Sequence, residues 1–223
     1  MPVDRLAALL PGLGVEATGL GVPGANLFVS KAGSGFHVAP YLRGTALVSA
    51  RLAWGPAVGR LWAEVPGLSI PEGHLLHPLV AIVVAEASHP RCGAEALLQG
   101  YVQSLVVHLL RQAIERGPSA QGVLAGLADP RLARVLVSLH EDAARDWRIE
   151  DMAEIAGMSR SAFMALFSGK LGEPPAAYLR RWRMDRAKAD LAAGGRVGVV
   201  ARRYGYTSAD AFTRAMKAHL AAA

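Results

Sequence analysis

The feature that most constrains the fold is a pair of short amphipathic helices joined by a glycine turn, which the sequence contains twice. In residues 147–167, apolar residues at helical spacing give a first helix one buried face, Gly157 ends it, and Ser159 supplies an N-cap for a second helix. Residues 197–216 repeat this layout around Gly205. One such pattern occurs in many helical domains, whereas its recurrence predicts two helix-turn-helix units whose second helices enter DNA major grooves.

A basic helix is predicted between the two units. Two prolines open it, as proline at a first helical turn often does, and it extends over residues 176–191. Arg180, Arg181 and Arg183 cannot all face one way, because successive helical positions turn by about 100°. We expect one or two of them to contact the DNA backbone and the others to pair with acidic neighbours such as Asp185.

The formal net charge of +6 at pH 7 is unevenly distributed. Residues 159–223 contain 12 lysines and arginines against 4 aspartates and glutamates, a difference of +8. Such a surplus on recognition helices and their spacer is the electrostatic footprint of a surface that contacts DNA phosphates. A solvated basic face is the alternative for any charge run, and the paired helix-turn-helix pattern favours DNA binding.

The first predicted recognition helix offers DNA few base-reading groups. Its outward residues are Ser159, Arg160, Ser161 and Met164. Arginine or glutamine would read guanine or adenine with two hydrogen bonds, and neither Ser161 nor Met164 can do so. The first unit is therefore expected to contribute shape fit, methyl contacts to thymine, and a phosphate contact through Arg160.

The second predicted recognition helix offers more base-reading groups. Its DNA-facing candidates are Thr207, Ser208, Asp210, Thr213 and Arg214. Arg214 is suited to guanine, while Asp210 either accepts from cytosine or caps its own helix. Thr207 and Ser208 suit phosphates, as do backbone amides at a helix N-terminus.

Three colinear stretches carry a resemblance to the AraC/XylS family of bacterial transcription regulators: residues 155–163, 172–184 and 201–215. The resemblance covers about residues 130–220. It implies a double helix-turn-helix DNA-binding domain over residues 129–223, double-stranded promoter DNA as the partner, and RNA polymerase as a further candidate partner. The single cysteine, with no signal-peptide pattern and no membrane-spanning run, favours a cytoplasmic location.

Residues 1–73 are rich in glycine and proline and contain short β-type runs, at 25–30, 35–38, 45–54, 59–65 and 68–70. They predict a small antiparallel β-sandwich or a partial cupin-like barrel. From His74 the periodicity becomes helical, so the fold class expected for the whole chain is α+β.

Residues 75–128 are similar to the helical tail of the cupin-type sensor domain in one branch of the AraC family. This similarity implies a cupin-like effector-binding and dimerisation domain over residues 1–116, a homodimer formed through its helices, and a linker at 117–128. An ordinary intramolecular core helix is the alternative for the long apolar stripe of residues 94–116.

Basic and aromatic residues on or beside the predicted strands are candidates for effector binding: Lys31, Arg43, Arg51, Arg60, Trp54 and Trp62. Such a set would suit a flat anionic ligand, such as a cyclic dinucleotide or another nucleotide second messenger, or an aromatic acid. Solvated surface arginines are the alternative.

No catalytic, cofactor-binding or metal-binding constellation is predicted. His74 and His77 have only Glu72 nearby and do not follow the cupin metal pattern. Cys92 is the one cysteine, so no intrachain disulfide can form, and the apolar run at 79–85 is too short to span a membrane. Two rival functions stay open: a DNA-binding protein that needs no effector, and a metal-dependent cupin-like enzyme fused to a DNA-binding module.

Overall fold

The computed structural model describes residues 4–6, 10, 13–54, 56–117 and 121–221. The chain divides into two compact units. The N-terminal unit comprises residues 12–54 and 62–116, and the C-terminal unit comprises residues 1–11, 55–61 and 117–223. Residues 118–120 of the predicted linker lie outside the described part of the chain. No described helix is both long enough and apolar enough to cross a membrane.

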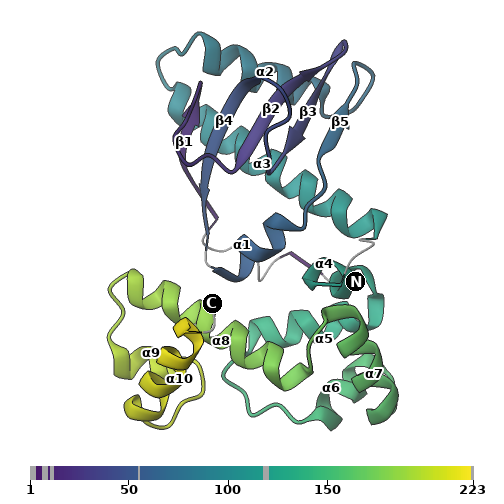
Figure 1. The fold of residues 1–223 in the computed structure, drawn as a ribbon, viewed down its shortest axis with the longest axis vertical. Helices are drawn as coiled ribbons and strands as arrows, with labels where there is room; N and C mark the ends of the chain where they lie inside the picture. Colours follow the sequence, from purple (N-terminus) through teal and green to yellow (C-terminus); the bar gives the residue numbers. More distant parts are fainter. Residues whose placement is uncertain (1–3, 7–9, 11–12, 55, 118–120, 222–223) are drawn as a thin grey trace. The chain divides into compact units, whose positions relative to one another are not determined.

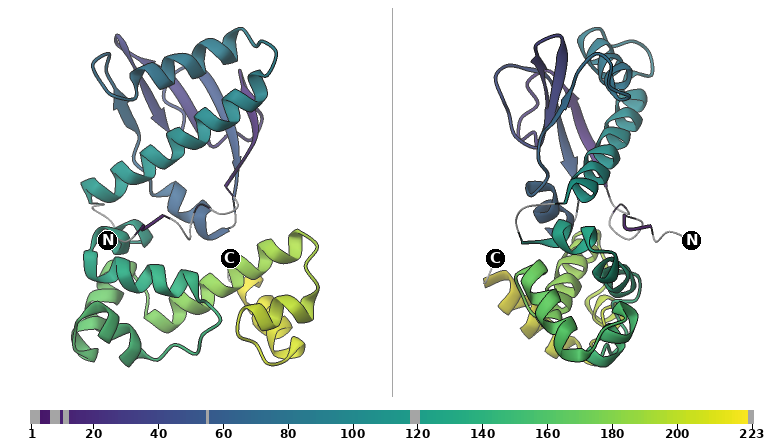
Figure 2. Two further views of the ribbon diagram at one scale, coloured as in Figure 1. Left: turned by 180° about the vertical axis from the view of Figure 1, so that it is seen from behind. Right: turned by 90° about the vertical axis from the view of Figure 1, so that its right-hand side faces the viewer.

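The N-terminal unit consists of an antiparallel sheet with two helices on one face (Figures 1 and 2). Its five strands are paired in the order β1-β4-β2-β3-β5. They are β1 (Gly14–Gly19), β2 (Leu27–Ala32), β3 (Gly35–Ala39), β4 (Ala46–Ala53) and β5 (Leu68–Ile70). The helices are α2 (His77–Ser88) and α3 (Ala94–Arg116), which pack against each other.

The core of this unit follows from the alternation of apolar residues along the strands. Val29 on β2 is paired with Val38 on β3 and with Val48 on β4, and all three valines are buried. Because successive strand residues point to opposite faces, this register puts one apolar row on the same side of the sheet. The antiparallel β-rich N-terminal region predicted from the sequence is confirmed.

The arrangement of these strands differs from the predicted β-sandwich or partial cupin-like barrel. All the described strands belong to one sheet, and the second layer is formed by helices. The apolar stripe of α3 is largely used inside the chain, since Leu98, Leu105 and Leu109 are buried. The intramolecular alternative therefore accounts for most of that stripe, although Leu97 is 45% exposed.

The strand predicted at residues 59–65 is wrong, because this stretch lies mostly in helix α1 (Pro56–Ala63). A short apolar run does not distinguish a strand from a buried helix segment, and proline is favourable at a first helical position. Trp62 is buried, and its indole N–H donates to the carbonyl oxygen of Asn26 at 2.7 Å.

The two edges of the sheet are irregular or short. β1, which the sequence did not predict, pairs with β4, and its register shifts between Val15 and Ala17. Glu16 lies at this bulge. The opposite edge, β5, is only three residues long.

The C-terminal unit is helical in its described residues from 121 onward (Figure 1). Its helices are α4 (Val123–Ala128), α5 (Pro130–Glu141), α6 (Ile149–Ala156), α7 (Arg160–Leu171), α8 (Pro175–Ala192), α9 (Val197–Arg203) and α10 (Ala209–Ala221). The two predicted helix pairs correspond to α6 with α7 and α9 with α10, and the predicted basic spacer corresponds to α8. These elements of the prediction are confirmed.

An aromatic stack joins α5, α7 and α8. The His140 ring lies 3.7 Å from the Trp182 ring, centroid to centroid, and its Nε2 atom is 2.7 Å from the Tyr178 hydroxyl oxygen. Phe167 packs edge-on against Tyr178. Burial, with the nearby positive charge of Arg186, lowers the pKa of His140 to about 3. His140 is therefore neutral near pH 7 and serves as a core residue.

The N-cap of α6 lacks a suitable side chain. Arg148 occupies this position and makes no side-chain hydrogen bond to the first turn, although the Asp151 carboxylate accepts from the Arg148 backbone N–H at 3.4 Å. Replacing Arg148 with serine should supply the missing acceptor and raise the free energy of unfolding by about 0.5–1 kcal/mol. Urea unfolding followed by helical circular dichroism measures this gain. The Arg148→Ala control should show none; an equal gain there would attribute the effect to the lost charge.

Candidate nucleic-acid interface

The first helix-turn-helix is built from α6 and α7. Gly157 ends α6 in the left-handed conformation, with φ of 67°, which glycine adopts without a steric cost. Ser159 then caps α7, because its hydroxyl accepts from the Ala162 backbone N–H at 3.3 Å. Phe163 and Phe167 are fully buried on the inner side of α7. The opposite side of this helix is left for a partner.

The second helix-turn-helix, formed by α9 and α10, has the same construction. The turn contains Gly205 with φ of 81°, and the Ser208 hydroxyl accepts from the Ala211 backbone N–H at 3.1 Å. Phe212 and Met216 are buried on the inner side of α10. Ser208 is therefore the cap of α10, which settles the alternative that Asp210 caps its own helix.

The outward residues of α7 form a small and weakly charged surface. Ser159, Arg160 and Ser161 are exposed, and Met164 is half-buried. Arg160 forms an exposed ion pair with Glu150 of α6, with 3.2 Å between nitrogen and oxygen. Such a pair is weak in water, so Arg160 can exchange Glu150 for a phosphate at little cost.

The outward residues of α10 include the stronger base-reading groups. Asp210, Thr213 and Arg214 are exposed, as is Thr207 in the preceding turn. The Thr213 hydroxyl donates to the Ala209 carbonyl oxygen at 2.8 Å, so Thr213 can offer a base its methyl group and an acceptor. Arg214 retains its guanidinium donors in solvent, which suits a guanine edge.

The three arginines of α8 have different surroundings. Arg180 is exposed. Arg181 is held by Glu173 and lies 3.9 Å from the Asp185 carboxylate, with its guanidinium over the Tyr178 ring. Arg183 donates to the carbonyl oxygens of Ala143 and Arg145. The expected division into exposed and internally paired arginines is present, but the partners of Arg183 are backbone carbonyls, which the sequence did not predict.

Comparison with known proteins agrees with this geometry. Residues 152–223 match the family model described as a helix-turn-helix domain. A 149-residue stretch, 66% of the chain, is 35% identical to a "Putative AraC-like transcription regulator" of Streptomyces lividans, and covers 49% of that protein. This part of the chain is similar to helix-turn-helix domains and to AraC-like transcription regulators.

Two further relatives show a similar likeness. The chain is 32% identical over 143 residues to an uncharacterized HTH-type transcriptional regulator of Haemophilus influenzae, which covers 64% of the chain and 48% of the relative. It is 28% identical over 137 residues to the HTH-type transcriptional regulator AlkR of Acinetobacter baylyi, covering 60% and 44%. The chain thus spans about half the length of the curated relatives it matches, and no solved structure matches it.

Lys217 is a further candidate for the DNA-contacting surface of α10 that was not predicted from the sequence. Lys217 is exposed on α10, one turn beyond Thr213 and Arg214. Residues three or four apart lie on one face of a helix, so this spacing could have identified Lys217 as part of the same surface.

The predicted effector residues, all but Arg60 of which lie in the N-terminal unit, have separate partners. Arg51 pairs with Glu16 at 2.8 Å and donates to the Pro23 carbonyl oxygen. Lys31 lies over the Phe36 ring and Arg43 over the Tyr41 ring. Trp54 and Trp62 contact each other, with ring centroids 5.1 Å apart. Arg60 lies in α1, and its side chain is outside the described structure.

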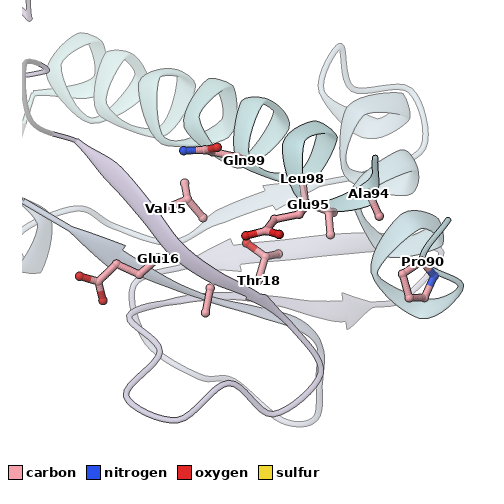
Figure 3. Close-up of a pocket in the computed structure, with 9 residues that line it drawn as sticks. Val15, Glu16, Thr18, Pro90, Ala94, Glu95, Leu98 and Gln99 are labelled. Carbon is pink, nitrogen blue, oxygen red and sulfur yellow. The ribbon is translucent and has the colours of Figure 1, made fainter. Parts of the chain in front are cut away.

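A cavity of about 370 Å³ opens in this unit between β1 and α3 (Figure 3). It is lined by Val15, Glu16, Ala17, Thr18, Pro90, Ala94, Glu95, Leu98 and Gln99. Thr18 and Glu95 point toward one another across it. Its lining contains two carboxylates and no lysine or arginine, so it does not suit the predicted anionic ligand. Within the described residues, no three histidine, cysteine or acidic side chains are grouped so as to hold a metal ion.

Proposed function

We propose that this chain is a sequence-specific transcription regulator that binds double-stranded promoter DNA through its C-terminal unit. The observation that carries the proposal is the pair of capped helices α7 and α10, each with a buried aromatic inner face and an exposed outer face, on the two sides of α8. Helices built in this way enter major grooves, and a second unit extends the recognised sequence. The names of the relatives support the same function.

The two recognition helices are assigned different tasks. α10 presents Arg214, Asp210 and Lys217, whereas α7 presents Ser161 and Met164 and has Arg160 at its start. Direct discrimination between base pairs requires donors or acceptors at the groove floor. We therefore assign most of the sequence reading to α10, and assign shape fit, thymine contacts and phosphate contacts to α7, with Arg180 as a further phosphate contact.

Arg214→Ala tests this assignment. Loss of the guanidinium should weaken binding to the preferred duplex by about 1–3 kcal/mol and relax selectivity at one base position. Arg180→Ala, which removes a proposed phosphate contact, is the comparison. It should weaken binding to all duplexes alike and reduce the slope of log K against log salt concentration by about one. Binding of both variants to a library with single base-pair changes gives the two patterns. Uniform weakening by Arg214→Ala would contradict its role in base reading.

Control by a small effector is assigned to the N-terminal unit. A ligand alters promoter occupancy only if it binds one arrangement of the protein better than another. The separated basic residues give an anionic effector no common cavity among the described residues. The cavity between β1 and α3 is lined by Glu95 and by Glu16, which is paired with Arg51, and by no lysine or arginine, so it favours a cationic or neutral ligand. Mobility shifts with nucleotides, aromatic acids and amines decide the class. Tight specific binding that no compound alters would favour the effector-independent alternative.

A homodimer remains part of the proposal. Ile82 on α2 and Leu97 on α3 are 46% and 45% exposed, on the two helices predicted to make the dimer contact. Sedimentation of the whole chain tests this directly. RNA polymerase is a further proposed partner, as expected for a regulator of transcription.

A further inference from the structure

The loop between α5 and α6, residues 142–148, is held by residues far away in the sequence. Arg183 on α8 donates its Nε–H to the Ala143 carbonyl oxygen at 2.6 Å, and one of its terminal amino groups donates to the Arg145 carbonyl oxygen at 2.8 Å. The turn of the second helix-turn-helix touches the residue between them. A Cβ atom on Gly205 would lie only 2.8 Å from the Ala144 carbonyl oxygen.

Arginine is specifically suited to this contact. Its planar fork presents two donors in a fixed geometry, which here reach two alternate carbonyls of one loop. The side chain is half-buried, and this burial lowers the pKa of Arg183. A lysine at this position would keep the positive charge but could not present the same two-donor fork.

The loop leads directly into α6, the first helix of the first helix-turn-helix. It is also closed on itself, because the Trp147 indole N–H donates to the Asp142 carbonyl oxygen at 2.8 Å and the Arg145 guanidinium lies 4.3 Å from the Trp147 ring centroid. Arg183 therefore connects the spacer helix α8 to the start of the first helix-turn-helix. Gly205 connects the second helix-turn-helix to the same loop.

The second helix-turn-helix also makes direct contacts with α8. Asp190 accepts from Arg203 at 2.8 Å and from the Tyr204 hydroxyl at 3.0 Å. Asp185 is buried and lies 2.9 Å from His219 Nε2 on α10. The aromatic stack packs α8 against α5 and α7, and the Arg183 fork adds a second contact, to the loop that leads into α6, so both contacts bear on the separation and rotation of α7 relative to α10.

We propose that Arg183 is a positioning residue that sets the distance and helical phase between the two recognition helices, and thereby which spacing of DNA segments the chain accepts. This inference rests on the proposed DNA-binding function. Moving one segment by one base pair shifts it along the DNA and rotates it by about a tenth of a turn. A rigidly joined pair gains affinity from simultaneous binding only at the matching spacing, whereas a loosely joined pair gains less and discriminates less.

The test uses the whole chain and a duplex that the wild type enriches from a random-sequence library. Derived duplexes have one base pair inserted or removed between the two recognised segments, or one segment scrambled. Arg183→Lys should lose about tenfold in affinity for the best spacing and discriminate less among spacings. Its affinity for the single-segment duplexes should stay within about twofold of wild type, with an unchanged salt slope, because the charge is retained.

Three outcomes would overturn the inference. The first is that the wild-type chain binds duplexes of all spacings equally. This result needs no variant, so it decides the question even if Arg183→Lys fails to fold. An Arg183→Lys profile identical to wild type would show that the fork is not needed. The third is that Arg183→Gln weakens binding to every duplex alike while Arg183→Lys does not. Because only the glutamine variant loses the positive charge, this result would make Arg183 a phosphate contact.

Arg111→Lys, the same chemical change at an exposed position on α3, is the matched control and should leave the spacing profile unchanged. Thermal unfolding of each variant separates a change in stability from a change in spacing preference. If the wild type enriches no duplex at all, the proposed function itself fails, and this result is distinct from binding with indifferent spacing.

Discussion

Replacing Gly205 with alanine should destabilise the C-terminal unit by about 2–5 kcal/mol. Two costs add at this position. A φ of 81° places the residue in the left-handed region, which costs an L-residue about 1–2 kcal/mol. The new methyl group would also lie 2.8 Å from the Ala144 carbonyl oxygen, and displacing packed backbone of this kind costs about 1–3 kcal/mol.

Gly157→Ala is the matched control for this change. Gly157 is also left-handed, with φ of 67°, but the nearest atom to its Cβ would be the end of the Arg134 side chain at 3.9 Å. Only the conformational cost of about 1–2 kcal/mol applies there. Urea unfolding of both variants, followed by helical circular dichroism, gives the difference. Equal losses would show that the Ala144 contact relaxes freely.

Acid should destabilise the C-terminal unit through His140. Its pKa is about 3 in the folded protein and about 6.5 in the unfolded chain, so between these values the unfolded state binds the extra proton. The stabilisation is complete above pH 6.5 and is lost as the pH falls. The loss is about 1.4 kcal/mol per pH unit and reaches up to about 5 kcal/mol near pH 3.

The measurement is the free energy of unfolding between about pH 7 and pH 5 by chemical denaturation. Tryptophan fluorescence, to which Trp182 stacked on His140 contributes, is followed in parallel. His140→Gln removes the titrating group and should flatten this part of the pH dependence, although it lowers stability at pH 7. If the variant retains the wild-type slope, other groups cause the acid sensitivity.

The helix-turn-helix pairs were predictable because their signals are local. Gly157 and Ser159 mark the end of one helix and the start of the next within three residues, and the inner-face phenylalanines follow at helical spacing. The same reasoning predicts α10 to be the richer reading surface. Lys217 was missed only because the pattern was not extended by one further turn.

The contacts of Arg183 and the arrangement of the N-terminal sheet could not be predicted, because they depend on residues far apart in the sequence. Arg183 reads as one more cation of a basic helix, and only the folded chain brings it to carbonyls 40 and 38 residues away. α1 was mistaken for a strand because a short apolar run does not by itself distinguish a strand from a buried helix segment. One sheet covered by helices cannot be distinguished from two packed sheets until the strand order is known, since both present the same alternation.

The irregular edges of the N-terminal sheet have a consequence for aggregation. An exposed, regular edge strand is a template onto which another chain can add, and bulges, charges and short length each prevent this. β1 combines a bulge with Glu16, and β5 offers only three residues. Strand addition between copies is thereby disfavoured at both edges of the sheet, so we expect the sheet to resist edge-to-edge polymerisation even at high protein concentration.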